Sequence, residues 1–221
     1  MIENILWMLA IMALTAWSCS GFIKNRSRPE RKRFIKYAEI ALICRFVIVF
    51  VIYSNGVDVS GTDGLLYHMV AKDVANQLVT GTPIWGVKYE YTWYTVLIGI
   101  QYAVLGVNRY AASFINAYLA ILSGLFLTGI CLNLNFSYKK SAFIGHAFMF
   151  MPSMMIWTTD TRKESMIFFS SILIWYLTLK LLKEREWSKR KRILYISAIC
   201  LLLWVSTLLR IHMLFTLGGG L

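Results

Sequence analysis

The sequence predicts an all-α membrane protein, a polytopic bundle of about six spanning helices with one or two interfacial helices in its first outer loop. Of its 221 residues, 58% are hydrophobic. Several apolar runs approach the length of about 20 residues that a helix needs to cross a bilayer core. The formal net charge of +12 comes from cations clustered between these runs. That clustering is typical of cytoplasmic loops beside anionic lipid and excludes nucleic acid as the expected partner.

Seven apolar runs divide the chain. Six of them are expected to span the membrane, at 4–22, 37–54, 110–134, 141–157, 165–182 and 193–215. The run 91–106 contains Gln101 and is only about 16 residues long, which is short for a span. Before the first run the chain carries Glu3 but no Lys or Arg, so this run is expected to be a mature span and not a signal peptide.

The distribution of Lys and Arg decides whether 91–106 crosses the membrane. Segments 23–36 and 180–192 carry seven cations each, and Lys139 and Lys140 stand between two spans. If 91–106 does not cross, all sixteen cations lie on one side, which the positive-inside rule makes cytoplasmic. The prediction is therefore a multi-pass protein of a bacterial inner (plasma) membrane, with its N-terminus outside.

The first outer loop, 55–109, begins with an amphipathic helix. Its apolar residues recur at helical spacing, so the helix is expected to lie in the membrane interface. They are Leu66, Tyr67, Val70, Ala71, Val74, Ala75 and Leu78. Thr62 or Asp63 is placed to cap its first turn, and Gly81 followed by Pro83 ends it. Later in the same loop, the apolar run 91–106, which is expected not to cross the membrane, would form a second juxtamembrane helix that is inserted more deeply.

Asp63 has two interpretations. As a helix cap, its carboxylate would accept a backbone hydrogen bond. As a functional group at the membrane surface, it would take a proton from a hydroxyl. The two roles are compatible, because a cap would also fix the position of the carboxylate.

The second outer loop, 158–164, reads TTDTRKE. It is either a solvated turn with a charge cluster or half of an active site that faces the helix beginning near Asp63. If it is half of a site, the two outer loops should approach each other around a shared cavity.

Arg45 lies inside the second span, where a charge is costly and suggests a function by default. The structural alternative is that its side chain reaches toward the cytoplasmic end of the helix or pairs with Glu39.

The order of these features resembles the N-terminal module of the C-type (GT-C) membrane glycosyltransferases, which include protein O-mannosyltransferases and lipid A aminoarabinose transferases. A span is followed by D-x3-Y-x3-A, a Gly-Thr-Pro turn, an aromatic stretch and LG-x2-R-x-A. A span, a basic turn, another span and a short outer loop with a lysine and a carboxylate come next. The matching positions are Asp63, Tyr67, Ala71, Gly81, Pro83, Leu105, Gly106, Arg109, Ala111, Pro152, Lys163 and Glu164. The module would occupy 37–221, preceded by an extra span and basic cytoplasmic loop at 1–36.

The resemblance implies inverting transfer of a sugar from a polyprenyl-phosphate donor to an acceptor hydroxyl at the outer face, in cell-surface glycan assembly. Asp63 matches the acidic residue that activates the acceptor, and Glu164 matches a second acidic residue, with Asp160 as its substitute. Cations on the same side would neutralise the leaving phosphate. They are Lys163, Arg162, Lys88 and Arg210, and Tyr67 and His68 are supporting residues. Some members use a divalent metal, for which Asp63 and Glu164 would offer oxygen ligands.

This chain departs from the family in two ways. Many relatives carry Pro-Pro or Lys-Pro where this chain has Thr92-Trp93, so Lys88 is only an offset match to their phosphate-binding lysine. The family usually has many more spans, so the chain is expected to be an N-terminal module, truncated at its C-terminus, that needs a further module or partner subunit. The alternative is a non-catalytic membrane subunit or remnant of a polysaccharide assembly complex. Expected partners are a lipid-linked sugar donor, a glycan, lipid or protein acceptor, and membrane lipids.

Overall fold

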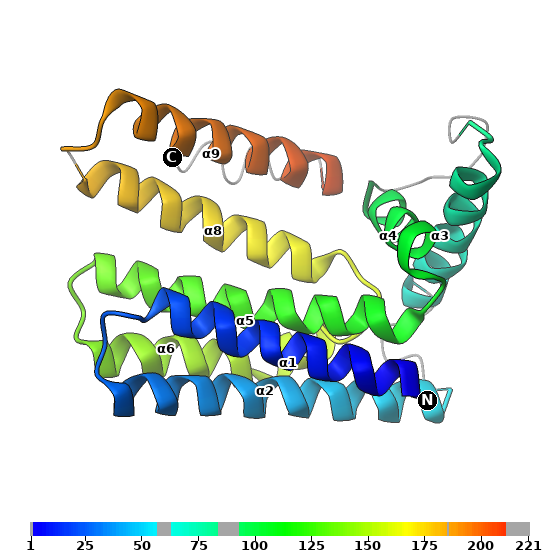
Figure 1. Ribbon diagram of the computed structural model, residues 1–221, viewed down its shortest axis with the longest axis horizontal. Coiled ribbons are helices and arrows are strands. Elements are labelled where there is room, and N and C mark those ends of the chain that lie inside the picture. Colours follow the sequence, from blue (N-terminus) through cyan, green and yellow to red (C-terminus); the bar gives the residue numbers. More distant parts are fainter. Residues whose placement is uncertain (1, 57–62, 84–92, 185, 211–221) are drawn as a thin grey trace.

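A computed structural model describes residues 2–56, 63–83, 93–184 and 186–210, and within these ranges it contains helices and turns but no strand (Figure 1). The prediction of an all-α bundle is confirmed. The helices are α1 (Ile2–Phe22), α2 (Arg28–Ser54), α3 (Asp63–Thr80), α4 (Trp93–Leu105), α5 (Arg109–Asn133), α6 (Tyr138–Phe150), α7 (Pro152–Trp157), α8 (Glu164–Lys183) and α9 (Lys189–Leu209).

Four of the described helices, α1, α5, α8 and α9, are long and apolar enough to cross a membrane. Helix α2 has 27 residues and is therefore about 40 Å long, which also suffices, but its first turns are strongly basic. The described part of α9 ends at Leu209, so the predicted span over 193–215 is seen only in part.

The prediction of one continuous span over 141–157 is wrong. The helix breaks at Met151, whose backbone is extended, and the chain continues as the short helix α7. Pro152 is the cause, because proline has no N–H to continue the helix and disfavours the helical conformation in the residue before it. It instead occupies the first position of α7, where its missing donor does no harm.

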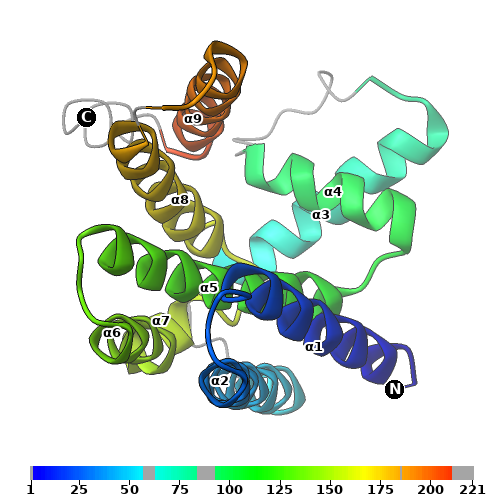
Figure 2. The same cartoon turned by 60° about the vertical axis from the view of Figure 1, so that its left-hand side comes forward.

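Helix α5 occupies the middle of the bundle and packs against α1, α2, α6 and α8, while α9 packs on α8 (Figure 2). Small residues allow a close approach to α6: a Cβ added at Gly145 would collide with Thr128 and with the backbone of Gly124. Such small-residue contacts let membrane helices pack without cavities.

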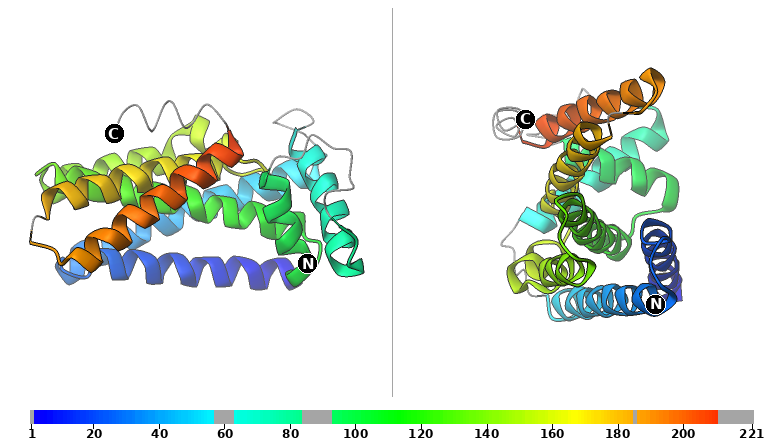
Figure 3. Two further views of the ribbon diagram at one scale, coloured as in Figure 1. Left: turned by 90° about the horizontal axis from the view of Figure 1, so that it is seen from above. Right: turned by 90° about the vertical axis from the view of Figure 1, so that its left-hand side faces the viewer.

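Helices α3 and α4 form a pair that lies across one end of the bundle, at a steep angle to the long helices (Figure 3). Val70, Ala71, Val74 and Ala75 of the predicted apolar stripe are buried, whereas Leu66 and Leu78 are exposed. Gly81 follows the last residue of α3 with φ of 71°, a left-handed conformation that glycine adopts without strain. Asp63 is the first residue of α3, and Thr62 lies outside the described residues.

The turns after Phe22, Asn133 and Lys183 all lie at the other end of the bundle, on the left of Figure 1. We call this the basic end, because most of the clustered cations lie in or beside these turns, and we call the opposite end the α3–α4 end. This is the arrangement expected if 91–106 does not cross the membrane.

The orientation is testable with cysteines placed at the basic end. Ser137→Cys and Ser188→Cys, at exposed positions, are expected to react with a membrane-impermeant maleimide only after the membrane is permeabilised. Thr80→Cys, exposed at the α3–α4 end, is the matched control and should react in intact cells. The background should lack Cys44 and Cys200, which are partly accessible. Labelling of residue 137 or 188 in intact cells would contradict the assigned orientation.

Candidate functional site

The turn at 158–162 is buried, not solvated. Thr158, Thr159, Asp160, Thr161 and Arg162 are each at most 3% exposed. A turn this polar can be buried only if its donors and acceptors find partners in the protein. The interpretation of TTDTRKE as a solvent-exposed charge cluster is therefore wrong for these five residues.

Asp160 is the centre of the polar network that accommodates the turn. Its Oδ1 accepts hydrogen bonds from the hydroxyl of Tyr53 (2.9 Å) and the backbone N–H of Thr161 (2.7 Å). The same oxygen forms an ion pair with Nη2 of Arg109 at 3.0 Å. The Arg109 guanidinium also lies over the Tyr53 ring, 4.2 Å from its centroid. We call Tyr53, Arg109 and Asp160 the Asp160 network; it joins α2 and α5 to the turn.

Asn116 fixes the backbone of the same turn. Its Nδ2 donates to the carbonyl oxygens of Asp160 (2.7 Å) and Arg162 (3.0 Å) and to the hydroxyl of Tyr94 (2.8 Å). Because Tyr94 belongs to α4, one amide side chain in the middle of the bundle connects the turn to the helix pair. Burial raises the pKa of the Tyr94 phenol well above its ordinary value, so the phenol stays neutral.

Arg45 approaches the turn from within the bundle and is fully buried. Its Nε donates to Oγ1 of Thr158 at 3.3 Å, and its Nη1 donates to the carbonyl oxygen of Ala41 at 3.1 Å. The side chain therefore does not reach the cytoplasmic end of α2, and the described ion pairs do not include one with Glu39, so both structural expectations for Arg45 are wrong. Its contact with Thr158 instead makes it a support of the turn.

Several of the residues predicted as acid, base or phosphate ligand influence the phenol of Tyr67 electrostatically. Burial raises the pKa of Tyr67, the carboxylates of Asp63 and Glu164 raise it further, and the guanidinium groups of Arg162 and Arg210 oppose that effect. Lys163 places its Nζ 5.9 Å from the Tyr67 ring centroid. We call Asp63, Tyr67, Arg162, Lys163, Glu164 and Arg210 the Tyr67 cluster.

The two carboxylates of the Tyr67 cluster have different surroundings. Asp63 is exposed at the start of α3. Glu164 begins α8, and its Oε1 accepts a hydrogen bond from Nη2 of Arg210 at 3.0 Å. Its Oε2 is buried and accepts no hydrogen bond from the residues that the structure describes. Glu164 is thus held in place through Oε1, while Oε2 has no hydrogen-bond donor among the described residues.

His68 contacts Tyr102 of α4. Its Nδ1 lies 2.9 Å from the hydroxyl of Tyr102. Burial lowers the pKa of His68, Arg109 and Lys72 lower it further, and Asp160 raises it. Lys88, the remaining predicted phosphate ligand, lies outside the described residues.

Gly64 lies between the Asp160 network and the Tyr67 cluster. Because it has no side chain, the start of α3 can lie directly against the Asp160 carboxylate. A Cβ at this position would collide with the carboxylate of Asp160. The residue after Asp63 therefore sits directly on the centre of the buried network, which fixes where the Asp63 backbone lies.

Gly64→Ala is expected to destabilise the protein by about 1–3 kcal/mol, the usual effect of overpacking a tight site. It should also shift the start of α3 and with it Asp63. Thermal unfolding of the detergent-solubilised protein measures the effect. Gly21→Ala is the control, since nothing lies within 4 Å of a Cβ there. Equal unfolding temperatures for the two variants would show that α3 does not press on Asp160.

The described residues do not fit a metal site. No group of three or more His, Cys, Asp or Glu side chains among them is placed to hold a metal ion. Of the two carboxylates that the family resemblance suggests as ligands, Glu164 already forms an ion pair with Arg210. We therefore assign no step of the chemistry to a metal.

The two cavities that stand out in the described part of the chain, of about 790 and 180 Å³, are not lined by Asp63 or Glu164. The shared outer cavity expected between the two outer loops stays a prediction, because part of the first loop lies outside the described residues. Any substrate of the Tyr67 cluster would meet it from the surface, where Asp63 and Arg210 are exposed.

Comparison of the chain with protein-family models, with curated proteins and with solved structures finds no match.

Proposed function

We propose that the chain is a glycosyltransferase module that moves a sugar from a polyprenyl-phosphate donor to an acceptor hydroxyl at the α3–α4 end, in the assembly of a cell-surface glycan. The observation that carries the proposal is the grouping of carboxylates with cations at this end: Glu164 pairs with Arg210 at 3.0 Å, Lys163 lies 5.9 Å from the Tyr67 ring, and Asp63 begins the helix that holds Tyr67. Transfer from a phosphate-linked sugar needs both kinds of group, a carboxylate for the acceptor proton and cations for the phosphate.

In the proposed reaction, the acceptor oxygen attacks the anomeric carbon of the donor and inverts its configuration. The bond from that carbon to the phosphate oxygen breaks, and its electron pair leaves with the polyprenyl phosphate. The acceptor proton passes to a carboxylate. Asp63 suits the role of base because it is exposed at the surface that an acceptor would reach. Glu164, whose Oε1 is held by Arg210, would be the second acidic residue of the site.

The cations of the Tyr67 cluster divide between direct and indirect roles. Arg162 is 3% exposed and stacks on Trp157, with Cζ 4.6 Å from the ring centroid, so it would act through its field and not by touching a phosphate. Arg210, whose side chain is 41% exposed, and the half-buried Lys163 are placed to contact the leaving phosphate directly. An arginine offers a phosphate two parallel donors, which a lysine does not.

One observation favours the alternative, a non-catalytic subunit of a polysaccharide assembly complex. Neither of the two cavities above adjoins the Tyr67 cluster, whereas ligand sites usually bury most of their ligand in a concave pocket. A partner subunit would supply the missing wall in that case.

The two functions are distinguished by a transfer assay on the purified chain in lipid nanodiscs. A panel of polyprenyl-phosphate donors with labelled neutral and amino sugars is supplied with membrane extract as acceptor. Release of free polyprenyl phosphate together with transfer of the label supports the glycosyltransferase. No release with any donor, combined with a larger membrane protein that co-purifies in stoichiometric amount, supports the subunit.

A further inference from the structure

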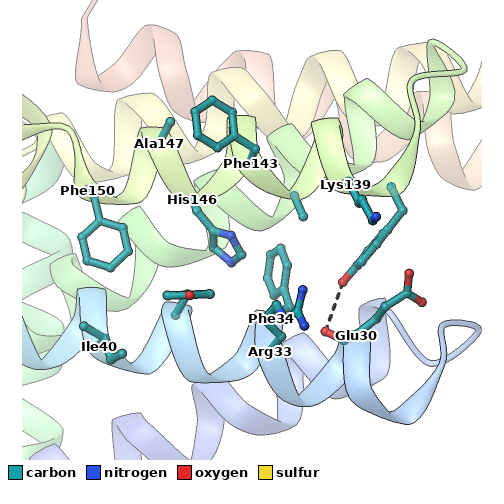
Figure 4. Close-up of a pocket in the computed structure, with 12 residues that line it drawn as sticks. Glu30, Arg33, Phe34, Ile40, Lys139, Phe143, His146, Ala147 and Phe150 are labelled. Atoms are coloured by element: carbon teal, nitrogen blue, oxygen red, sulfur yellow. Dashed lines mark hydrogen bonds between the residues drawn. The ribbon is translucent and has the colours of Figure 1, made fainter.

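The larger cavity lies between α2 and α6 (Figure 4) and reaches their first turns at the basic end; no residue of the Tyr67 cluster lines it. Its volume is about 790 Å³. Its walls are mostly aromatic and aliphatic, and its mouth carries charged residues from the first turns of both helices. We propose that this cavity binds one anionic phospholipid of the leaflet that meets the basic end, with an acyl chain along the apolar walls and the phosphate at the mouth.

The whole cavity, from its charged mouth to its apolar end, is about as long as one leaflet is thick. It extends along α6 from Lys139 at the mouth to Phe150, the last residue before the helix breaks. Eleven residue steps at 1.5 Å correspond to about 16 Å. Half of the hydrocarbon core of a bilayer is about 15 Å thick. A groove of this length suits the acyl chain of a lipid in a single leaflet.

The walls offer contacts for a flexible chain. Phe34 is buried at the base of the groove, and the His146 ring lies against it with centroids 4.5 Å apart. Phe143 on the opposite helix is 72% exposed, and Ile40 is also exposed, so the groove is open toward the surrounding bilayer. Because the groove is open on this side, lipid can enter from the membrane without passing through the protein.

The mouth favours a negatively charged headgroup. Arg33 comes from α2 and Lys139 from α6, so two helices present a cation to the same opening (Figure 4). The acidic side chain that lines the cavity, Glu30, is engaged elsewhere: its carboxylate accepts hydrogen bonds from the backbone and hydroxyl of Ser27 and closes the cap of α2. The hydroxyl of Tyr138 donates to the Glu30 carbonyl oxygen at 3.3 Å and joins the two rims. The mouth is thus complementary to a phosphate.

The lipid site is tested by native mass spectrometry of the whole chain released from nanodiscs that contain equal amounts of phosphatidylglycerol and phosphatidylcholine. We expect the wild-type protein to retain phosphatidylglycerol about tenfold more often, since Arg33 and Lys139 both lie at the mouth that would hold the headgroup. The double variant Arg33→Gln, Lys139→Gln should lose this preference while still retaining lipid. The control is Lys189→Gln, Arg190→Gln, which removes the same charge from exposed positions at the same end and should keep the preference.

A second variant tests the walls independently of charge. Ala147→Trp places a large ring in the groove from an exposed position and is expected to reduce retention of both lipids at least tenfold. Three results would each overturn the proposal. The first is wild-type lipid retention in Ala147→Trp, and the second is an unchanged preference for phosphatidylglycerol in the Arg33, Lys139 double variant. The third is a loss of preference in the Lys189, Arg190 control as large as in that double variant. None of these outcomes depends on sugar transfer, so the site is judged separately from the proposed function.

Discussion

Asp63→Asn is expected to lower the rate of sugar transfer by about 10²–10⁴-fold, the usual contribution of a positioned general base. The amide keeps the shape of the side chain but takes no proton from the acceptor hydroxyl. Folding should be nearly unaffected, because Asp63 is exposed and exposed substitutions usually change stability by less than about 0.5 kcal/mol. The rate is measured with whichever labelled donor the transfer assay identifies, on protein with an unchanged unfolding temperature.

Asp73→Asn is the matched control for this prediction, since it makes the same change at another exposed position of α3. It should transfer at the wild-type rate. Asp63→Glu should retain part of the activity, because it keeps the carboxylate and moves it by one methylene. Full activity of Asp63→Asn would reject Asp63 as the base and leave Glu164 as the other predicted acid of the cluster.

Hydropathy and charge predicted the bundle and the placement of its turns because both depend on composition along the chain. Amphipathic periodicity likewise predicted α3, and Gly81 its end. The sequence also contained the cause of the break between α6 and α7, because Pro152 lies inside the apolar run. Hydropathy does not detect it, since it measures apolar character and not the backbone N–H that proline lacks.

The burial of the turn at 158–162 could not be predicted from the turn itself. Two of the residues that accommodate it, Tyr53 and Asn116, lie in other helices, at least 42 residues away in sequence. A signal did exist in those helices, because a polar side chain in an apolar run needs a partner. Arg45 and Asn116 carry that signal, but the sequence does not say that both meet the same turn.

The Tyr67 cluster depends on this buried turn. Arg162 is its last residue and Lys163 follows directly, and Gly64 allows the start of α3 to lie against Asp160. The candidate reactive groups are thus held by residues that would take no part in the reaction. A rigid support of this kind is what keeps catalytic side chains within reach of each other.

Asp160→Ala is therefore expected to cause the largest loss of stability among these variants, about 3 kcal/mol. Removing one partner of a buried ion pair leaves the other without compensation. The hydroxyl of Tyr53 would also lose an acceptor. The Arg109 side chain is 22% exposed and can partly rehydrate, which places the expected loss at the lower end of the range for buried pairs. Reversible unfolding in mixed micelles measures the loss, with Asp73→Ala as the exposed control.

A double-mutant cycle with Arg109→Met separates the ion pair from the rest of the network. If the pair at 3.0 Å is the main contribution, the two changes together should cost at least about 1 kcal/mol less than the sum of the single changes. Additive losses would mean that Asp160 acts through Tyr53 and the backbone of Thr161 and not through Arg109. If Asp160→Ala loses no more stability than Asp73→Ala, the turn at 158–162 does not support the Tyr67 cluster.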